Sequence, residues 1–495
     1  MLTTFSQFFP ILGFCWQNDT VDNSHSRLKS VALITVAIGL VFQATPAFAQ
    51  TVSFEARLKA LEAEFEARSK ALEAEISKLR SALAVVENPI IQIENIPQNS
   101  KPIVPSKAND TLKSEGFKVG NTELKFGGHI DLDVHLTKTS DGALAEGLAE
   151  DVFVPSLTPV GDGTNDAGDF QLDTTVNTSR LVFSTSTPAG DKDIKTHIGL
   201  DFLVSPGGNE LISNSFNPRI RRVFVDYNGW RLGQDWSTFQ GTHALTESAS
   251  FHAPVESQVF VSQPQVRYTH GNFEFAVENP ETFVNVIDSE IAAIGAGGEA
   301  AIQSNEGALP DFVARYNFKG DWGIVSLAGL ARNLSFETED SSANGIAFDD
   351  STFGYGLSLT GRINTIDEDD FRFSLNGGKG IGRYIGSGIL QGAQANLETG
   401  ELAAIGAISA NGTYRHVRGP WSFNLGLSWI DIDLDSNIPQ NLNETGEAYS
   451  GYLAILKKVA PSMTFGVEYL NAERELVSGV DGDLDRFTFS AKKNF

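Results

Sequence analysis

Cysteine is nearly absent from this 495-residue sequence, and basic residues are outnumbered by acidic ones. The one cysteine, Cys15, lies in an N-terminal segment that we expect to be removed, so the mature chain has no thiol. This excludes disulfides, cysteine-based zinc sites and cysteine nucleophiles. Lys and Arg number 37 against 62 Asp and Glu, a net charge of −25. Such an acidic chain lacks the basic surface that nucleic acids require, and we predict no nucleic-acid partner.

Long apolar runs are also missing. The one extended run, 31–42, follows Arg27 and Lys29 and precedes Ala47-Phe48-Ala49. It is shorter than the roughly 18 residues of a membrane helix. The order of basic residues, apolar run and small-residue site is typical of a secretory signal peptide, which we assign to 1–49. An uncleaved anchor helix is the alternative.

A repeat follows the signal peptide. The segment EARLKALEAE at 55–64 returns as EARSKALEAE at 66–75, an offset of eleven residues. An eleven-residue apolar period predicts a nearly straight or slightly right-handed coiled coil, and its narrow apolar stripe favours pairing with copies of itself. We assign the coil to 50–88, with a single solvated helix as the alternative, and a proline-rich linker to 89–121.

Residues 122–495 alternate between apolar and polar side chains. In 123–136, for example, Leu124 and Phe126 face one side while Glu123 and Lys125 face the other. This period predicts half-buried β-strands. We expect sixteen strands: 122–136, 172–187, 192–204, 219–228, 230–238, 262–270, 272–279, 310–319, 321–333, 351–363, 370–380, 402–418, 420–434, 446–459, 461–473 and 483–495.

The connections between these strands alternate between short and long. Short turns on one side and long loops on the other are typical of outer-membrane barrels, whereas a soluble sheet is the alternative. Trp230, Trp322 and Trp421 each follow a short turn, as expected of an interfacial aromatic girdle. We therefore predict an all-β fold, a 16-stranded antiparallel transmembrane β-barrel. Because the strand number is even, both ends of the barrel segment and the coil that precedes it should lie on the periplasmic side. A barrel of this size encloses an aqueous channel.

Arginines recur on the polar face of these strands. Of Arg221 and Arg222 we expect Arg222 to point inward. Rings of such cations favour anions, although the arginines could instead pair with Asp131, Asp133, Glu274 and Glu468 and brace the wall. The predicted pore-lining and substrate-binding residues are Arg180, Lys195, Arg222, Arg231, Arg267, Arg315, Arg332, Arg362, Arg372, Arg415 and Arg486.

The acids gather in the long connections 140–169, 281–309 and 334–350. We interpret them as a solvated outer mouth among lipopolysaccharide. Asp431, Asp433 and Asp435 share one face but do not complete a calcium loop, so we predict no metal and no cofactor.

The connection 239–261 differs from the other loops because it contains no Lys or Arg and few glycines. Its place after the fifth strand makes it a candidate to fold inward and narrow the bore. We expect His243, Glu247, His252 and Glu256 to line that constriction, with an outer loop at a subunit contact as the alternative.

Several motifs resemble the DcaP-like outer-membrane channels. They are Tyr227-Asn228-Gly229-Trp230, Gly233-Gln234-Asp235-Trp236-Ser237-Thr238-Phe239, Gln265-Val266-Arg267-Tyr268-Thr269 and Gly380-Ile381-Gly382-Arg383-Tyr384. The resemblance implies a homotrimer whose coil reaches into the periplasm and a pore for small organic anions such as dicarboxylates. The terminal Phe495 likewise resembles the signal read by the barrel-assembly machinery.

Three other functions remain as alternatives. A phosphate-selective porin would be favoured by a lysine-rich constriction. A barrel enzyme would need a Ser-His-acid arrangement, and the sequence contains neither a G-x-S-x-G nor an H-x-S motif, so we predict no enzyme. A barrel that tethers the outer membrane to the cell wall through its coil is the third.

Overall fold

The computed structural model describes residues 116–145, 147–161, 170–203, 208–209, 215–286, 301–304, 309–338, 348–396, 399–435, 438 and 442–495. The predicted signal peptide 1–49, coil 50–88 and most of the linker lie outside these residues. Among the described residues, no helix is long and apolar enough to cross a membrane.

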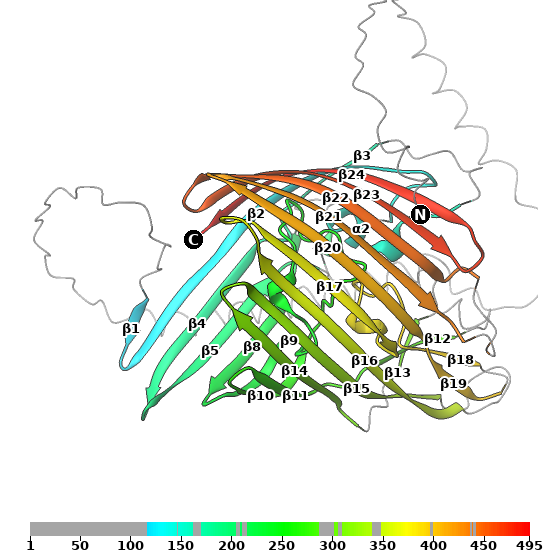
Figure 1. The fold of residues 1–495 in the computed structure, drawn as a ribbon, viewed down its shortest axis with the longest axis horizontal. Helices are drawn as coiled ribbons and strands as arrows, with labels where there is room; N and C mark the ends of the chain where they lie inside the picture. Colours follow the sequence, from blue (N-terminus) through cyan, green and yellow to red (C-terminus); the bar gives the residue numbers. More distant parts are fainter. Residues whose placement is uncertain are drawn as a thin grey trace, which may run out of the picture. The chain divides into compact units, whose positions relative to one another are not determined.

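One antiparallel sheet closes on itself into a barrel (Figure 1). Its strands are β1 (Phe117–Val119), β2 (Thr122–Thr139), β3 (Gln171–Thr175), β4 (Arg180–Ala189), β5 (Lys192–Asp201), β8 (Arg219–Tyr227), β9 (Trp230–Trp236), β10 (Ser262–His270), β11 (Phe273–Glu278), β14 (Asp311–Gly320), β15 (Gly323–Thr338), β16 (Phe348–Asn364), β17 (Asp370–Lys379), β20 (Gly406–Arg418), β21 (Trp421–Asp433), β22 (Thr445–Ala460), β23 (Met463–Leu476) and β24 (Asp481–Asn494). Because β1 is a short hairpin arm on β2, and β3 and β4 pair with successive parts of β2, the closed wall has 16 strands, as predicted.

The barrel closes between its first and last long strands. β2 and β24 pair from His129 with Asn494 to Thr139 with Leu484. Phe495 completes the seam, since its N–H donates to the carbonyl of Gly128 at 3.1 Å and its own carbonyl accepts from the N–H of Gly128 at 3.1 Å. Closure removes the open sheet edges that a membrane does not tolerate.

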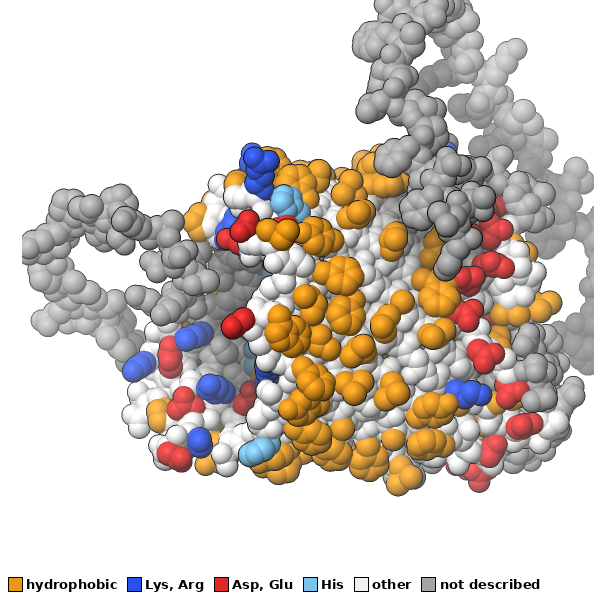
Figure 2. Space-filling view, in the orientation of Figure 1, with side chains coloured by type: hydrophobic (Ala, Val, Ile, Leu, Met, Phe, Trp, Pro, Cys, Tyr) orange, Lys and Arg blue, Asp and Glu red, His pale blue; other side chains and the backbone are white. Residues whose placement is uncertain are grey.

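The side-chain alternation places apolar residues outside and polar residues inside. On β21, Leu425 and Leu427 are 60% and 66% exposed, whereas Asn424 and Ser428 are buried in the interior. Figure 2 shows apolar side chains spread over this outer face. The pattern is the reverse of a soluble protein and fits an apolar solvent around the wall.

Short turns gather at one end of the barrel, which we call the short-turn end; the opposite end is the long-loop end. The turn Asn228-Gly229 has both residues at positive φ, 48° and 87°, as a type I′ hairpin turn requires. Trp230, Trp322 and Trp421 follow three of these turns and face outward, each between 38% and 48% exposed. Their placement agrees with the predicted girdle.

Acidic side chains mark the outer margin at the long-loop end. In the strand register, Asp431 lies opposite Glu447, Glu447 lies opposite Glu475, and Glu475 lies opposite Asp481, so that these acids follow one another across four neighbouring strands. Figure 2 shows this acidic margin at the right of the apolar face. In the part of the chain that the structure describes, no group of three or more His, Cys, Asp or Glu is arranged to hold a metal ion.

Most strand ends lie within a few residues of the expected ones, and three further differences affect the course of the strands. Residues 176–179 interrupt the expected strand 172–187, and the Oγ of Ser179 there accepts the N–H of Asp131. The expected strand 402–418 is two strands, β19 (Glu401–Ala404) and β20. The third difference is a bulge between β5 and β8, where Gly199 pairs with Arg222 but Leu200 pairs with Ile220.

Three segments from the long-loop end pack inside the barrel. The first is 141–161, with α2 (Leu148–Asp151) and a 3₁₀ turn at Pro155–Leu157. The second is 237–261, which we call the inner loop, with a 3₁₀ turn at Thr242–Ala244. The third is 380–405, with a 3₁₀ turn at Gly382–Tyr384 and the strands β18 (Ala393–Asn396) and β19. β18 and β19 form a small sheet with β12 (Thr282–Val286) and β13 (Ala301–Ser304), and β6 (Gly208–Asn209) pairs with β7 (Ser215–Phe216).

These segments give the barrel an interior apolar core. In one cluster, Phe239 and Val259 of the inner loop pack with Ile381, Tyr384 and Ile385 and with inward residues of β14, β15 and β20–β22. In another, Phe153 and Val255 pack against inward residues of β22–β24. These clusters fill part of the interior with apolar side chains, whereas charged side chains line the wall from β8 to β14, and a smaller charged group lies on β17 and β20.

Candidate functional site: the charged half of the barrel interior

A network of arginines and carboxylates crosses the inner wall from β8 to β14. Asp235 of β9 is its centre, because Arg222 and Arg231 both donate to its carboxylate and Arg267 lies 3.8 Å away. Arg231 also donates through two nitrogens to Asp226. Strand register explains the convergence, since Arg231 is directly opposite Asp226 on one side and Arg267 on the other.

Glu274 of β11 extends the network. It lies 3.8 Å from Arg267 and accepts a hydrogen bond from Arg315 of β14, its cross-strand partner. Arg315 also donates to the carbonyl of Gln240 in the inner loop. The network therefore both lines the wall and holds one end of the loop.

The bulge in β8 turns an additional arginine inward. We expected only Arg222 of the adjacent pair to face the interior, but both do, because the extra residue shifts the alternation while Ile220 stays 57% exposed outside. Arg221 lies over the rings of Trp236 and Phe251 at 4.8 and 5.5 Å. Arg219, which the sequence analysis did not select, pairs through two nitrogens with Asp201 at 2.8 and 2.9 Å.

A second charged group lies on β17 and β20. Asp370 accepts from both Arg372 and Arg415. Arg372 also donates to the carbonyl of Leu245, and Arg415 is 3.7 Å from Glu247. These two predicted arginines thus contact the inner loop rather than standing free in the bore.

The remaining predicted cations fall into two groups. Arg332 and Arg486 are only 2% exposed and act as braces: Arg332 lies 3.3 Å from Asp311, and Arg486 donates to Thr137 and to the carbonyl of Ala149. They do not line the lumen as expected, because inserted segments cover them. Arg180, Arg362 and Lys195 make no ion pair within the described part of the chain.

The four expected bracing acids also differ from one another. Glu274 pairs with arginines, but Asp131 pairs instead with Lys492 at 2.7 Å. Asp133 accepts from Thr178 at 3.2 Å. Glu468 accepts the N–H of Ala249 at 2.8 Å and the hydroxyl of Ser250 at 2.6 Å, so it anchors the inner loop to β23.

The inner loop crosses the interior along the wall. Two further residues of the loop anchor it, in addition to the contacts with Glu468. The N–H of Ser257 donates to Ser428, and its carbonyl accepts from Asn376. The carbonyl of Glu247 accepts from the hydroxyl of Tyr452. This path explains why the segment lacks the glycine-acid composition of solvated loops, since most of its side chains meet protein on every side.

The four loop residues that we expected at a constriction lie in different environments. His243 is half-buried, and desolvation lowers its pKa to about 4. Glu247 is half-buried and accepts from Ser422 at 2.6 Å. His252 is 7% exposed and bonds through Nε2 to Ser387 at 3.2 Å. Glu256 is fully buried, so it does not line the lumen; it accepts from Ser450, and burial raises its pKa.

The segment 380–405 was not identified from the sequence as part of the interior. The hydroxyl of Tyr384 donates to Asp311 at 2.7 Å and accepts from Gln263 at 2.9 Å. Gly380 has φ of +74°, and a Cβ at Gly382 would collide with the backbone of Gln391. The motif Gly380–Tyr384 therefore reflects a tight reversal that turns the chain into the barrel.

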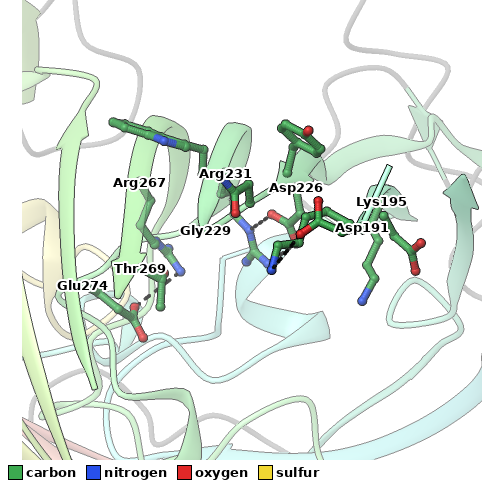
Figure 3. Close-up of a pocket in the computed structure, with 13 residues that line it drawn as sticks. Asp191, Lys195, Asp226, Gly229, Arg231, Arg267, Thr269 and Glu274 are labelled. Carbon is green, nitrogen blue, oxygen red and sulfur yellow. Dashed lines mark hydrogen bonds and ion pairs between the residues drawn. The ribbon is translucent and has the colours of Figure 1, made fainter. Parts of the chain in front are cut away.

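Two cavities lie along the charged half. The lower one, at the short-turn end, has a volume of about 700 Å³ and is lined by Lys195, Asp226, Arg231, Arg267 and Glu274 among others. Figure 3 shows Arg231 with its partner Asp226 between Lys195 on one side and Arg267 with Glu274 on the other. The upper one, of about 540 Å³, is lined by Arg219 and Arg383 and by apolar side chains.

Comparison with known proteins identifies the fold. The outer membrane channel DcaP of Acinetobacter baumannii superimposes with a TM-score of 0.60 at 18% sequence identity, over 77% of this chain and 99% of that one. OmpT of Vibrio cholerae and an anion-selective porin from Comamonas acidovorans both give a TM-score of 0.42, with 11% and 12% identity. They cover 77% and 76% of this chain and 100% of their own.

No family model and no curated sequence matches the chain. The structural likeness to DcaP confirms the expected fold.

Proposed function

We propose that this chain forms a passive diffusion channel in the outer membrane for small hydrophilic solutes, with a preference for organic anions such as dicarboxylates. Two features support the channel: a closed barrel that is apolar outside and charged inside, and the shared fold with an outer membrane channel. In an outer membrane, a barrel wall that is apolar outside and charged inside separates the lipid from an aqueous bore.

The observation that carries the anion preference is the unequal pairing on the inner wall. Six guanidinium groups, of Arg219, Arg221, Arg222, Arg231, Arg267 and Arg315, share only four carboxylates, of Asp201, Asp226, Asp235 and Glu274. Arg180, Arg362 and Lys195 add charge without an acidic partner in the described residues. Among these side chains the excess is positive although the whole chain is acidic, and a positive lining favours anions.

The two cavities suggest the path of the solute. Arg219 lines the upper cavity and Asp226 the lower one, and both belong to β8. The strand between them spans about 23 Å at roughly 3.3 Å per residue, and Arg221 and Arg222 lie along it. We propose that solutes descend along β8 and that the inner loop narrows the bore opposite this strand.

The lower cavity favours dicarboxylates over inorganic phosphate. Lys195 of β5 and Arg267 of β10 line it from separate strands, so two carboxylates of one solute can each meet a cation. The inner loop has no Lys or Arg, whereas a phosphate-selective constriction would concentrate cations at one point.

We further propose the assembly in which this channel acts. Three copies would associate, with the coil 50–88 in the periplasm and the barrel in outer-membrane lipid. The acidic margin at the long-loop end would then meet lipopolysaccharide, bridged by divalent cations. Phe495, which completes the seam, would also be the residue read by the barrel-assembly machinery.

The test is the reversal potential of the purified full-length protein in planar bilayers under a KCl gradient. We expect three equal conductance steps per insertion and a reversal potential of the sign for chloride over potassium. Addition of succinate should reduce the chloride current more than equimolar phosphate does.

A matched pair of variants separates the lumen from the rest of the surface. Arg222→Gln should reduce anion selectivity, whereas Arg418→Gln, which removes an exposed arginine beside a short turn, should leave it unchanged. Cation selectivity of the unmodified channel would contradict the proposal for anions while leaving the fold intact.

A further inference from the structure

The upper cavity differs in chemistry from the lower one. It lies at the long-loop end, where the three inserted segments meet β8, and holds about 540 Å³. Its walls are largely apolar and include Val152, Leu203, Phe251, Phe260, Phe283 and Leu390. The volume is within the range of small-molecule sites, roughly 300–1,000 Å³. A path for hydrated ions alone does not need such a lining.

The aromatic part of this wall is built in place. The rings of Phe251 and Phe260 lie 5.8 Å apart at 87°, and Phe260 also packs on Trp236 at 4.7 Å. Arg221 lies over both Trp236 and Phe251. These contacts fix the rings, so a bound apolar group would meet a formed surface rather than ordering one.

The cavity offers one guanidinium without an acidic partner. Arg219 is already neutralised by the two hydrogen bonds it donates to Asp201. Arg383, in contrast, donates to the carbonyl of Asn279 at 3.2 Å, and its Nε is buried with no hydrogen-bond partner. No carboxylate of the described residues lies within 4.0 Å of Arg383, so its charge is available to a ligand.

The polar atoms around Arg383 complete a small recognition surface. Ser387 and Gln391 line the same cavity and can donate hydrogen bonds. Burial lowers the pKa of His252 to about 4, so its ring is neutral at pH 7 and adds no second cation.

We propose that the upper cavity binds organic anions that carry one carboxylate and an apolar body about the size of a benzene ring. The carboxylate would pair with Arg383 and the body would pack between Phe251, Phe260 and Leu390. This inference rests on the proposed function, because it adds an amphipathic monocarboxylate site at the entrance to the anion path.

The experiment measures binding separately from conduction. The full-length protein in detergent micelles is titrated with 3-phenylpropionate by calorimetry, with succinate as the polar anion and 3-phenylpropanol as the neutral control for partition into the micelle. We expect 3-phenylpropionate to saturate one site per chain, and to bind more than about tenfold tighter than succinate or the alcohol, since it alone satisfies both the charge and the walls.

Three variants test the assignment. Arg383→Gln should weaken binding of 3-phenylpropionate about tenfold, Arg383→Lys should retain part of it, and Arg418→Gln should leave it unchanged. Gln391→Trp, which fills the cavity while keeping the cation, should also abolish binding. Far-ultraviolet circular dichroism and heat-modifiable migration of each variant establish that the barrel is folded.

The outcomes distinguish this inference from the proposed function. Equal binding of acid and alcohol, or unchanged binding in both Arg383→Gln and Gln391→Trp, would overturn the site even if the bilayer channel prefers chloride. A cation-selective channel that still binds 3-phenylpropionate would instead overturn the proposed function.

Discussion

At the scale of single residues, the interior arginines differ in the groups that they contact. Arg332 and Arg486 are buried and bound to backbone carbonyls, so they support inserted segments. Arg222 and Arg231 share the carboxylate of Asp235. Arg180 makes no ion pair in the described chain, and the residue opposite it on β2 is His129, which is not an acid. Arg180 is therefore less neutralised by direct partners than the arginines that share Asp235.

We therefore expect Arg180→Gln to lower the chloride-to-potassium permeability ratio by roughly twofold, because it removes an unneutralised charge from the lumen. The ratio is obtained from the reversal potential in a KCl gradient. The control is Arg418→Gln on the outer surface. An unchanged ratio in Arg180→Gln would show that Arg180 lies off the ion path.

A buried histidine predicts a pH dependence. The folded-state pKa of His252 is about 4 against an ordinary value of 6.5. The unfolded chain therefore binds more protons between these values, so the favourable contribution of the neutral ring is fully present above pH 6.5 and declines as the pH falls towards 4. Burial of the ring away from water is the cause of this lowered pKa.

We expect the inner loop to loosen between pH 6.5 and 4, seen as greater current noise or altered conductance in bilayers. In His252→Asn, which keeps a polar side chain but does not titrate, this change should be smaller. A pH response that is identical in the variant would assign the effect to another group.

At the scale of elements, the inner loop depends on a few anchors on the far wall. Glu468 accepts from both Ala249 and Ser250 and is 4% exposed. Glu468→Ala leaves the buried N–H of Ala249 without its acceptor and leaves the hydroxyl of Ser250 only the carbonyl of His252 at 3.4 Å, at a cost of about 1–3 kcal/mol. We expect higher single-channel conductance and a lower temperature of heat-modifiable migration. Glu468→Gln keeps one acceptor, so its conductance and its temperature of heat-modifiable migration should lie between those of Glu468→Ala and those of the unmodified protein.

Close packing between strands predicts a second element-scale effect. Gly233 of β9 has φ of +131°, and a Cβ there would collide with the carbonyl oxygen of Val223. Gly233→Ala should therefore destabilise the barrel by roughly 1–3 kcal/mol. Gly329→Ala on β15 is the matched control, because its nearest neighbour would be Leu357 at 3.9 Å. Equal thermal stability of the two variants would contradict this assignment.

The strands were predictable from the sequence because alternation is a local property. Each of the sixteen expected strands corresponds to an observed one, apart from the break at 176–179 and the division of 402–418 into β19 and β20. The bulge that turns both Arg221 and Arg222 inward was not predictable, since it depends on how β5 pairs with β8. A register shift of one residue leaves no mark in the period of either strand alone.

The inserted segments show the same limit. The composition of 239–261 indicated an unusual loop, and the structure places it inside the barrel. Sequence reasoning did not assign Glu256 to a buried anchor or Arg383 to a cavity, because both roles arise from segments more than 100 residues apart. Ile381 and Ile385 belong to a core that no single element defines.

At the scale of the whole molecule, the seam between β2 and β24 closes the barrel. Phe495 exchanges two backbone hydrogen bonds with Gly128, and its ring lies 5.9 Å from that of Phe126. We expect deletion of Phe495 to reduce the amount of assembled protein in the outer membrane, whereas Phe495→Trp should preserve it.

Refolding into detergent separates the two roles proposed for this residue. If the deletion variant refolds in vitro with unchanged thermal stability but fails to assemble in cells, the terminal aromatic acts in recognition by the assembly machinery. A loss of stability in vitro would assign the effect to closure of the seam.

The packing of the interior is lopsided: apolar segments occupy one side of the cylinder, and the charged wall borders the other. Under the proposed function, selectivity would therefore depend mainly on one arc of the wall, and stability mainly on the other. If the chain acts as proposed, substitutions of the charged side chains on β8–β11 would change which solutes are admitted with little effect on the apolar clusters. Changes in the inserted segments, by contrast, would affect throughput and stability together, so variation in solute range among similar barrels should concentrate on the open arc.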